Sequence, residues 1–416
     1  MPLCNESPEL IVGKPMWLGP APRIVIGITN AQTCLVLSGR IRALLDAGFH
    51  VTVLSSPGDL LDLMEHDEGV ATLRVPIQRG IAPVADLLSL YRLWRLLLKL
   101  KPDVAEFSTP KAGFLGMIAA FLAGIPHRVY SLRGLKLESL HGIRRLVLLL
   151  TERAAAACAH VVLCNSGSLR KKALEIGLAS DEKLHILGPG SSNGINAVRF
   201  RPGVSDVRKQ FGIPEGARVL GFVGRLTRDK GIPELIDAFE RIFPVMPYVY
   251  HLLVGWFDEA EDALKRELRS RILANPHIVC TGFVVDAAPC YQAMDLLVLP
   301  SMREGFPNVV LEASASGIPV ISTLSTGARD SVVHGKTGLL VRFGDRDALF
   351  DAIMRLLRDA NERQQMGTAG RAWVLEQFLD RRIRKLTEVF YRDLLKPGEF
   401  SASSEPPVMD WAALSR

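Results

Sequence analysis

The sequence predicts an α/β protein built from two doubly wound domains that face one another across a cleft. The chain has 416 residues, which is about the length of two ordinary domains. Hydrophobic residues make up 48% and charged residues 23%, so each half can bury a core of its own. In both halves, short β-branched runs alternate with helix-patterned segments, and this alternation favours βα units and parallel sheets.

The first half of the chain is predicted to begin with a strand. The expected strands are 23–29, 50–56, 103–109, 127–134 and 160–166, and the expected helices are 35–49, 87–103 and 111–126. Gly48 stops the helix at 35–49, and Pro102 ends the long amphipathic helix at 87–103.

The second half repeats this rhythm after a segment rich in Gly, Ser, Asn and Pro at 188–203, which marks the boundary between the halves. The expected strands are 218–225, 248–257, 277–284, 319–324 and 338–343. A helical turn followed by a strand is expected within 291–301. The expected helices are 231–243, 307–317 and 378–395. We expect the residues beyond the last helix to form a loose tail, in which Trp411 could dock.

Positive charge is concentrated in the first half. The net charge is +6, but residues 79–199 hold 17 Lys plus Arg against 8 Asp plus Glu, which leaves a sum of −3 for the rest. Such asymmetry indicates an anionic partner, either phosphate, nucleic acid or an acidic membrane; a scattered, solvated surface is the alternative. No recognisable nucleic-acid-binding module is present, so we expect no nucleic acid partner.

Cysteine spacing and hydropathy exclude several protein classes. The six cysteines form no Cys-x-x-Cys pair and no cluster with zinc-ligand spacing, which predicts reduced thiols in a cytosolic protein. The first 14 residues lack the pattern of a signal peptide. No stretch reaches about 18 apolar residues, so a membrane span is not expected.

A phosphate-binding turn is suggested by GFVGRLTRDKG at 221–231. A predicted strand ends at Gly224, a polar loop follows, and a helix then begins, so backbone N–H groups there can receive an anion. Arg225 can hold a phosphate through two hydrogen bonds, and Lys230 adds a second cation. The alternative is a solvated loop with two ordinary surface cations.

Two carboxylates flank an apolar stretch in REGFPNVVLEASASG at 303–317. Glu304 precedes Gly-Phe-Pro and is expected on a loop, whereas a helix beginning at Pro307 or Asn308 places Glu312 about one turn inside. Glu304 could then lie beneath a sugar ring, and Glu312 could accept hydrogen bonds from the hydroxyls of a ribose. Alternatively, Glu304 complements the helix dipole and Glu312 is simply solvated.

In sequence order, GFVGRLTRDKGIPELIDAF, PSMREGFPNVVLEASASGIPVIST and TGARDSVVHGKTGLLV resemble the C-terminal domain of the retaining, family 4 glycosyltransferases of GT-B fold. The resemblance covers about residues 20–395 and is strongest over 218–345. It implies two Rossmann-like domains: an acceptor domain at 20–197 and a nucleotide-sugar domain at 198–380. It also implies that a helix at 381–396 crosses back to the first domain, and that 397–416 is a tail.

The resemblance implies a role for each residue of the donor site. Arg225 and Lys230 would bind the donor diphosphate, Glu304 would contact the donor sugar and assist catalysis, and Glu312 would hold the ribose. The implied site also contains, beside the sugar or diphosphate, Gly224, Gly305, Phe306, Pro307, Asn308 and Val309. Pro307 has no N–H to donate. Val284 would lie beside the base. The family implies retention through front-face attack, with the leaving phosphate assisting as base.

We expect no metal or other cofactor, since the nucleotide sugar is itself a substrate and is expected to be a UDP-sugar. The sequence has one Asp-x-Asp, at 345–347. It lies near the end of the second domain, beside a predicted helix start, which is not a plausible position for a metal ligand. Arg225, Lys230 and a helix N-terminus are expected to stabilise the charge of the departing diphosphate.

The acceptor side departs from the family pattern. Many relatives carry histidines just before Pro110, where this chain has Glu106 and Ser108. Thr109 and Lys111 remain candidates for acceptor binding.

The segments YSLRGLKLES and GSSNGIN resemble the bacterial surface-polysaccharide branch, whose acceptor is often a sugar on undecaprenyl diphosphate. Arg133 and Lys136 could meet such phosphates, or they could belong to an ordinary basic surface loop.

This branch predicts a peripheral enzyme on the inner face of the cytoplasmic membrane. Residues 91–101 and 141–150 interleave basic and apolar side chains, as interfacial helices do, although such helices more often pack on a sheet. Two other interpretations stay open. The same fold could act on a soluble acceptor, or the chain could be an inactive nucleotide-sugar-binding scaffold.

Overall fold

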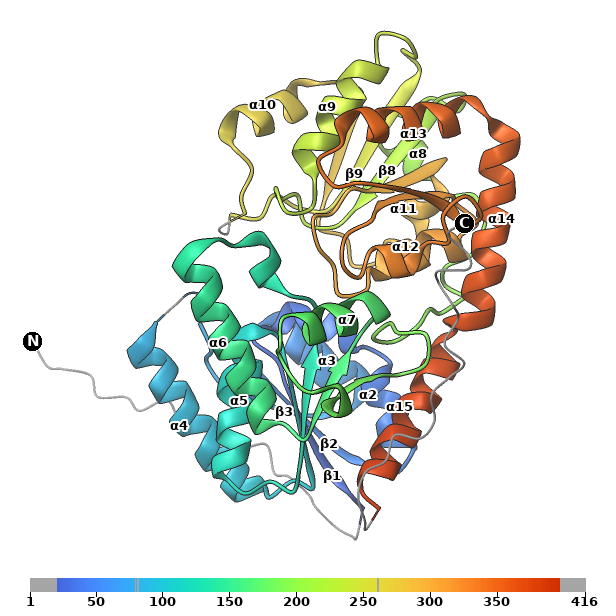
Figure 1. The fold of residues 1–416 in the computed structure, drawn as a ribbon. Coiled ribbons are helices and arrows are strands. Elements are labelled where there is room, and N and C mark those ends of the chain that lie inside the picture. The colour runs from blue at the N-terminus through green and yellow to red at the C-terminus, as the bar shows by residue number, and fades with distance from the viewer. Residues whose placement is uncertain (1–20, 79, 81, 260–261, 397–416) are drawn as a thin grey trace, which may run out of the picture.

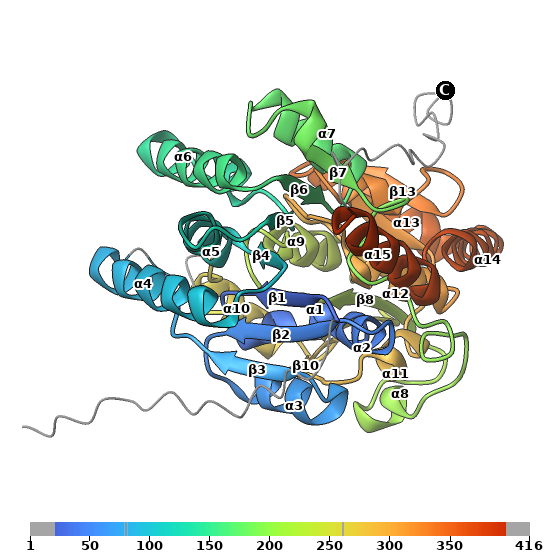
Figure 2. The same cartoon turned by 90° about the horizontal axis from the view of Figure 1, so that it is seen from below.

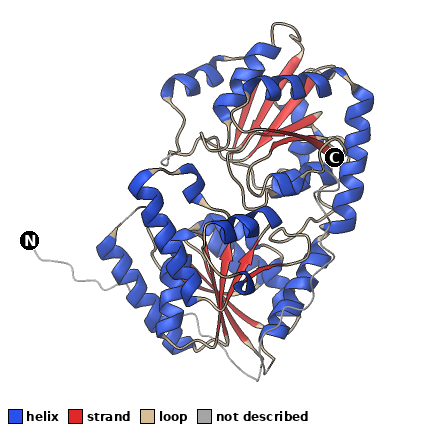
Figure 3. Cartoon of the chain, in the orientation of Figure 1, coloured by secondary structure: helices blue, strands red, loops and turns tan. Residues whose placement is uncertain are grey.

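A computed structural model describes residues 21–78, 80, 82–259 and 262–396, which form two α/β domains stacked one above the other (Figure 1). Each domain is built on a parallel sheet covered by helices on both faces, so the predicted fold class is confirmed (Figure 3). The expectations for the first 14 residues and for the tail at 397–416, including Trp411, lie outside the described residues.

The first domain contains a seven-stranded sheet of order β3-β2-β1-β4-β5-β6-β7, in which every neighbouring pair is parallel. Its strands are β1 (Arg23–Gly27), β2 (His50–Ser55), β3 (Ala71–Arg74), β4 (Val104–Ser108), β5 (His127–Leu132), β6 (Val161–Cys164) and β7 (Leu184–Ile186). The helices between them are η1 (Ala31–Thr33), α1 (Cys34–Leu37), α2 (Arg40–Asp46), α3 (Asp59–Glu68), α4 (Pro83–Leu100), α5 (Pro110–Leu122), η2 (Lys136–Ser139), α6 (Gly142–Cys158), α7 (Gly167–Glu175) and η3 (Asp181–Lys183). Helices α4, α5 and α6 lie side by side on one face of this sheet (Figure 2).

The second domain contains a six-stranded parallel sheet of order β10-β9-β8-β11-β12-β13. Its strands are β8 (Arg218–Val223), β9 (Val249–Val254), β10 (Ile278–Gly282), β11 (Leu296–Leu299), β12 (Val320–Thr323) and β13 (Gly338–Val341). Its helices are α8 (Val207–Gln210), α9 (Ile232–Ile242), α10 (Arg266–Ala274), α11 (Ala288–Gln292), α12 (Asn308–Ala315), η4 (Arg329–Ser331), α13 (Arg346–Arg358) and α14 (Ala360–Gln377).

Every predicted strand is present, but the single helix expected at 35–49 is wrong. The chain there forms α1 and α2, separated by Gly39 in the left-handed region with φ of 72°. The cause is Glu68, which is buried and accepts hydrogen bonds from the backbone N–H groups of Gly39 (2.6 Å) and Arg42 (2.8 Å). Its carboxylate satisfies N–H groups at the start of α2, and so stabilises a helix end in the middle of the apolar pattern.

The last helix, α15 (Asp380–Leu394), returns to the first domain, as predicted (Figure 1). Two connections run side by side at the crossing, where Ile195 N–H donates to the Phe378 carbonyl and Asp380 N–H donates to the Ile195 carbonyl. Phe390, Tyr391 and Leu394 of α15 belong to the apolar core of the first domain. The final helix is therefore a structural part of the domain that begins the chain.

A buried ion pair connects this returning helix to the first sheet. The Arg40 guanidinium of α2 donates to both carboxylate oxygens of Glu106 on β4, at 3.0 and 2.6 Å. Ser131 and Tyr391 also donate to Glu106, and both charged side chains are nearly inaccessible to water. Burial opposes the charge of Glu106, but the Arg40 guanidinium prevails and lowers the pKa of that carboxyl to about 2.

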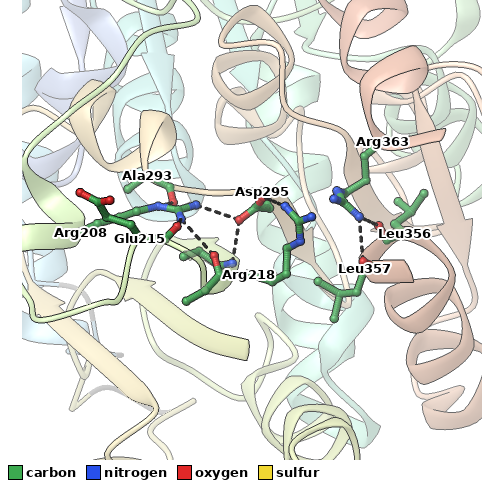
Figure 4. A network of polar contacts seen from close by, with 10 residues as sticks. Arg208, Glu215, Arg218, Ala293, Asp295, Leu356, Leu357 and Arg363 are labelled. Atoms are coloured by element: carbon green, nitrogen blue, oxygen red, sulfur yellow. Dashed lines mark hydrogen bonds and ion pairs between the residues drawn. The ribbon is translucent and has the colours of Figure 1, made fainter. Parts of the chain in front are cut away.

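At the amino edge of the second sheet, a network of polar contacts is centred on Asp295, which binds two arginines (Figure 4). Its carboxylate accepts hydrogen bonds from Arg208 (2.8 Å), Arg218 (3.0 Å) and the backbone N–H of Val219 (2.9 Å). Nearby, Arg363 of α14 donates to the carbonyls of Leu356 and Leu357 at the end of α13. These contacts fix the edge of the sheet that faces away from the first domain.

We predict that Glu106→Gln lowers the free energy of unfolding by about 3–5 kcal/mol, because it leaves Arg40 buried without its counter-charge. Since the folded-state pKa of Glu106 is depressed, its contribution is present above about pH 4.5 and is lost as the pH falls towards 2. The difference between wild type and variant should therefore shrink at low pH. Urea unfolding followed by circular dichroism at pH 7 and pH 3 measures both effects.

The matched control for this variant is Asp46→Asn. Asp46 forms an exposed ion pair with Arg42 at 2.9 Å, and such pairs contribute at most about 1 kcal/mol. Equal destabilisation by the two substitutions would contradict the role given to the buried pair.

Candidate functional site

The predicted donor residues gather at the carboxyl edge of the second sheet, where β8, β11 and their loops meet the first domain. Gly224 follows β8 with φ of 146°, and a Cβ on the neighbouring Gly255 would overlap the Gly224 carbonyl. Gly231 has φ of 73°, and a Cβ there would overlap the Pro300 carbonyl. Glycine at these positions lets the loop fold closely against its neighbours, which fixes where Arg225 and Lys230 emerge.

Arg225 is bound to carboxylates. Its guanidinium lies 2.8 Å from Asp258 and 4.0 Å from Asp229. Burial works against the charge of Arg225, but the hydrogen bond to Asp258 and the charge of Asp229 together raise its pKa. Arg225 therefore stays charged and is held in place at the sheet edge.

Lys230 and Glu304 form the central contact of the site. The Lys230 ammonium lies 2.6 Å from a Glu304 oxygen, and both side chains are largely buried. The loop that carries Glu304 is fixed by its backbone N–H, which donates to the Thr326 carbonyl at 2.9 Å. The two residues that the sequence assigned to the diphosphate and to the sugar are thus direct neighbours.

Glu312 lies one turn inside α12, which begins at Asn308 as predicted. The hydroxyl of Tyr291, on α11, donates a hydrogen bond of 2.6 Å to the Glu312 carboxylate. Burial raises the pKa of Glu312, while the Tyr291 hydrogen bond acts in the opposite direction. The alternative in which Glu312 is simply solvated is therefore wrong, because its carboxylate is bound by Tyr291.

The segment between the two glutamates contacts the first domain. A Cβ on Gly305 would overlap the Arg133 carbonyl, and the Asn308 side chain lies 3.5 Å from the Ser191 hydroxyl. Phe306 is buried against Phe378, with ring centroids 5.3 Å apart.

The remaining predicted donor residues lie on the surface of the second domain's core. Val309 and Val284 are both half-buried and pack against that core. Pro307 caps α12.

Three polar residues of this site were missed at the sequence level: Asp229, Asp258 and Arg303. Asp229 accepts hydrogen bonds from Thr227 (2.6 Å) and Arg303 (3.0 Å), and although burial opposes its charge, these neighbours lower its pKa. Asp229 lies between Arg225 and Lys230 in the sequence, and this position could have indicated that it belongs to the site. Asp258 lies beyond β9, and nothing in the sequence indicated that it belongs to the site, because only folding brings it to Arg225.

The predicted acceptor residues occupy the facing edge of the first sheet. Thr109 has φ of 71°, which is unusual for a β-branched residue, and its hydroxyl lies 2.5 Å from that of Thr29. Such strain is often found at functional positions. Lys111 is bound to Asp86 at 2.7 Å and donates to the Gly80 carbonyl, so its charge already has a partner.

Arg133 does not belong to an ordinary surface loop. The residue is half-buried, its guanidinium donates to the Ser192 hydroxyl at 3.0 Å, and its carbonyl faces Gly305. Burial, followed by the nearby charge of Arg40, lowers the pKa of Arg133 to about 10. Lys136 begins η2 and is also half-buried.

Glu106 and Ser108, which replace the histidines of many relatives, are fully buried in β4. The Glu106 carboxylate is committed to Arg40, so it does not face the other domain. Its presence is explained by the internal ion pair and gives no support to loss of function.

Side chains also join the two domains beside Glu304. Arg303 donates to the Ser139 hydroxyl at 3.1 Å, and Thr326 donates to the Glu138 carboxylate at 2.7 Å. Gly327 N–H donates to the Ser168 hydroxyl at 2.7 Å. The donor loops are therefore held against η2 and the start of α7.

Acidic residues elsewhere have structural partners. Asp345 caps α13 by accepting from the Ala348 N–H at 2.9 Å, and Asp347 lies 2.8 Å from Arg241. In the described part of the chain, no group of three or more His, Cys, Asp or Glu residues could hold a metal ion. The described cysteines, at 34, 158, 164, 280 and 290, are unpaired.

Comparison with known proteins gives consistent matches for both domains. The family described as glycosyl transferases group 1 matches residues 204–373, and the glycosyl transferase 4-like domain matches residues 36–190. The capsular polysaccharide biosynthesis glycosyltransferase CapM of Staphylococcus aureus is 36% identical, over 89% of this chain and 97% of its own length. The UDP-Gal:alpha-D-GlcNAc-diphosphoundecaprenol alpha-1,3-galactosyltransferase of Escherichia coli is 28% identical, over 80% of this chain and 88% of its own.

Solved structures share the fold. Sucrose-phosphate synthase of Thermosynechococcus elongatus superposes with a TM-score of 0.76 at 24% identity, over 89% of this chain and 99% of its own. Anabaena HepE, solved in complex with UDP-glucose, superposes with a TM-score of 0.74 at 22% identity, over 89% and 99%.

We predict that Gly305→Ala separates the two domains, because its methyl group would overlap the Arg133 carbonyl. The radius of gyration from small-angle X-ray scattering should increase, while the circular dichroism spectrum stays unchanged. Gly216→Ala is the control, since a Cβ at that exposed glycine meets no atom within 4 Å. An unchanged radius of gyration for Gly305→Ala would contradict the close approach.

Proposed function

Because this chain belongs to the group 1, family 4 glycosyltransferases of GT-B fold, we propose that it moves a sugar from a UDP-sugar to a polyprenyl-diphosphate-linked sugar. The product would be a precursor of a bacterial surface polysaccharide, such as a capsule, an O-antigen or an exopolysaccharide. The two curated relatives support this proposal: one is named for capsule synthesis, and the other for a UDP-sugar donor and a diphosphoundecaprenol acceptor.

The observation that carries the proposal is the Lys230–Glu304 contact of 2.6 Å beside Arg225 at the facing edges of the two domains. A departing nucleoside diphosphate gains negative charge as the bond between the anomeric carbon and the phosphate oxygen breaks. Arg225 and Lys230 supply preorganised positive charge where that oxygen leaves, so we propose that no metal ion or other cofactor is required. When the diphosphate binds Lys230, Glu304 is released towards the sugar.

Glu304 would then stabilise the positive charge that develops on the sugar ring. We propose retention of configuration: the acceptor hydroxyl attacks from the face that the diphosphate leaves. Its oxygen forms the new bond to the anomeric carbon, and its proton passes to a diphosphate oxygen. Glu312, positioned by Tyr291, would accept hydrogen bonds from the ribose hydroxyls.

The rest of the donor would lie along the same edge. Gly224, Gly305, Phe306, Pro307, Asn308 and Val309 would border the diphosphate and sugar, and Val284 the base. On the facing domain, Arg133 and Lys136 would meet the acceptor's phosphates, beside Thr109. Lys111 stays a prediction, because binding an acceptor there would require it to leave Asp86.

A polyprenyl-linked acceptor lies in the bilayer, so we propose that the enzyme works at the inner face of the cytoplasmic membrane. None of the described helices is long and apolar enough to cross a membrane. Attachment would therefore be peripheral as far as the described residues are concerned.

We predict that Glu304→Gln and Lys230→Ala each lower kcat by about 10²–10³-fold, because each removes charge stabilisation needed in the transition state. Lys230→Ala should also weaken UDP binding, whereas Glu304→Gln should keep it. Release of UDP from a panel of UDP-sugars, with a polyprenyl-diphosphate-linked sugar as acceptor, measures turnover. Isothermal titration with UDP measures binding.

Asp347→Asn, which breaks an exposed ion pair on the same domain, is the control and should leave turnover unchanged. Turnover of Glu304→Gln equal to that of wild type would contradict the catalytic role of Glu304, and binding of UDP without turnover in wild type would support the scaffold interpretation instead. Transfer to soluble sugars alone would support the soluble-acceptor alternative.

A further inference from the structure

The loop at 324–328, between β12 and η4, packs against the backbone of Glu304. The Glu304 N–H donates to the Thr326 carbonyl at 2.9 Å. Gly327 is buried with φ of 74°, and a Cβ there would overlap the carbonyls of Glu304 and Gly305. The position of Glu304 therefore depends on where this loop lies.

The first domain holds the same loop through Ser168, which lies in the first turn of α7. The Gly327 N–H donates to the Ser168 hydroxyl at 2.7 Å, and that hydroxyl donates in turn to the Asp330 carboxylate. The Ser168 N–H donates to the same Asp330 oxygen at 3.0 Å. Figure 1 shows α7 on the side of the first domain that faces the second. The start of α7 is thus bound both to the loop and to η4.

These contacts form one chain of hydrogen bonds, because the Thr326 carbonyl and the Gly327 N–H belong to the same peptide group. That group is planar, so it cannot turn away from Glu304 without also leaving Ser168. The chain runs from the Glu304 N–H to this peptide group, then to the Ser168 hydroxyl and finally to Asp330. Each group between the two ends accepts one hydrogen bond and donates the next. Hydrogen bonds arranged in this way polarise and strengthen one another.

Capping of α7 does not account for the whole arrangement. The N–H groups in the first turn of a helix have no partner within the helix, and a carboxylate beside them is stabilising. Ser166 already caps α7 from its own domain, by accepting from the Leu169 N–H at 3.3 Å. The bond from Gly327 to the Ser168 hydroxyl satisfies no N–H group of α7. That bond therefore fixes the loop rather than the helix.

The two halves of the loop are fixed from different domains. The Thr323 hydroxyl, at the end of β12, donates to the Ser301 carbonyl at 2.6 Å, which fixes the start of the loop within the second domain. Thr326 instead donates to Glu138 of the first domain at 2.7 Å, next to the contact that Gly327 makes. The second half of the loop is thus held in place only while the two domains face one another.

We propose that Ser168 and Asp330 are positioning residues of the transfer reaction: they hold the peptide group between Thr326 and Gly327, which in turn holds Glu304 at the donor sugar. Neither of them touches the substrate. The first domain, which is expected to bind the acceptor, thereby also sets the geometry of a donor-site carboxylate. This inference rests on the proposed function, because that function gives Glu304 its role at the sugar.

The test compares Ser168→Ala with wild type in the full chain. Loss of the hydroxyl leaves the Gly327 N–H without its acceptor, so Glu304 shifts and kcat should fall about tenfold. The affinity for UDP should not change, because Arg225 and Lys230 are not part of the chain of hydrogen bonds. Release of UDP from a UDP-sugar, with a polyprenyl-diphosphate-linked sugar as acceptor, gives kcat. Isothermal titration with UDP gives the affinity.

Substitutions of Asp330 separate geometry from charge. Both hydrogen bonds from Ser168 go to one Asp330 oxygen, which an amide can also supply. Asp330→Asn should therefore keep most of the turnover, whereas Asp330→Ala should lose as much as Ser168→Ala does. The control is Asp181→Asn, which breaks a 2.9 Å ion pair between the exposed Asp181 and Arg170 of the same helix, and should leave turnover unchanged. Equal losses for Asn and Ala at position 330 would overturn the proposal. So would an unchanged kcat for Ser168→Ala in an active preparation.

Hydrogen exchange separates this inference from the proposed function. Without any substrate, peptides covering 301–310 and 324–331 should take up deuterium faster in Ser168→Ala and Asp330→Ala than in wild type, because local opening becomes easier. Uptake in Asp181→Asn should equal that of wild type. If uptake changes in this way but wild type transfers no sugar, the positioning contacts stand and the proposed function fails. If uptake in Ser168→Ala equals that of wild type, the positioning role is overturned whatever the activity.

Discussion

All the strand pairs in both sheets are parallel, and this constraint decides where the chemistry of the protein lies. Loops that follow parallel strands emerge at one edge of the sheet, so each domain collects its predicted site residues at a single edge. The chain then places these two edges against one another, with Gly305 touching Arg133 and Arg303 touching Ser139. The opposite edge of the second sheet carries the network around Asp295, whose contacts are internal.

The two cations of the candidate site, Lys230 and Arg225, are neutralised by their neighbours. Lys230 is bound to Glu304, and Arg225 to Asp258. These contacts keep long, flexible side chains in place, so less conformational entropy would be lost on binding the diphosphate that we propose as their ligand. They also mean that an incoming anion must exchange partners rather than fill a vacant positive pocket. In the mechanism that we propose, Glu304 would then be free of Lys230 only when the donor is present, which would link its availability to substrate binding.

Periodicity and turn residues were sufficient to predict the parallel sheets and the start of α12, because these features depend on local patterns. The break between α1 and α2 was not predictable, since it depends on Glu68, which is 29 residues away from Gly39. Asp258 and Arg303 were missed for the same reason, because their contacts in the site are with residues distant in the sequence. Arg133 was singled out in the sequence as a cation. Only the folded chain shows that this residue is half-buried and that its guanidinium donates a hydrogen bond to Ser192.

Glu106 is a second instance of this limit. In the sequence it stood out as a departure from its relatives at an edge of the site. In the structure it is the internal partner of Arg40 and Tyr391, so the substitution belongs to the core of the domain rather than to its chemistry. A motif position therefore gives a reliable role only when the surrounding network is the same.

The return of α15 has a consequence for the order in which the protein can fold during synthesis. The first domain is complete only when Phe390, Tyr391 and Leu394 enter its core and Tyr391 reaches the Arg40–Glu106 pair. Among the described residues, the latest member of the second domain's core is Phe378, which directly follows α14. On the ribosome, the domain translated first must therefore wait for the end of the chain, and the domain translated second can finish before it.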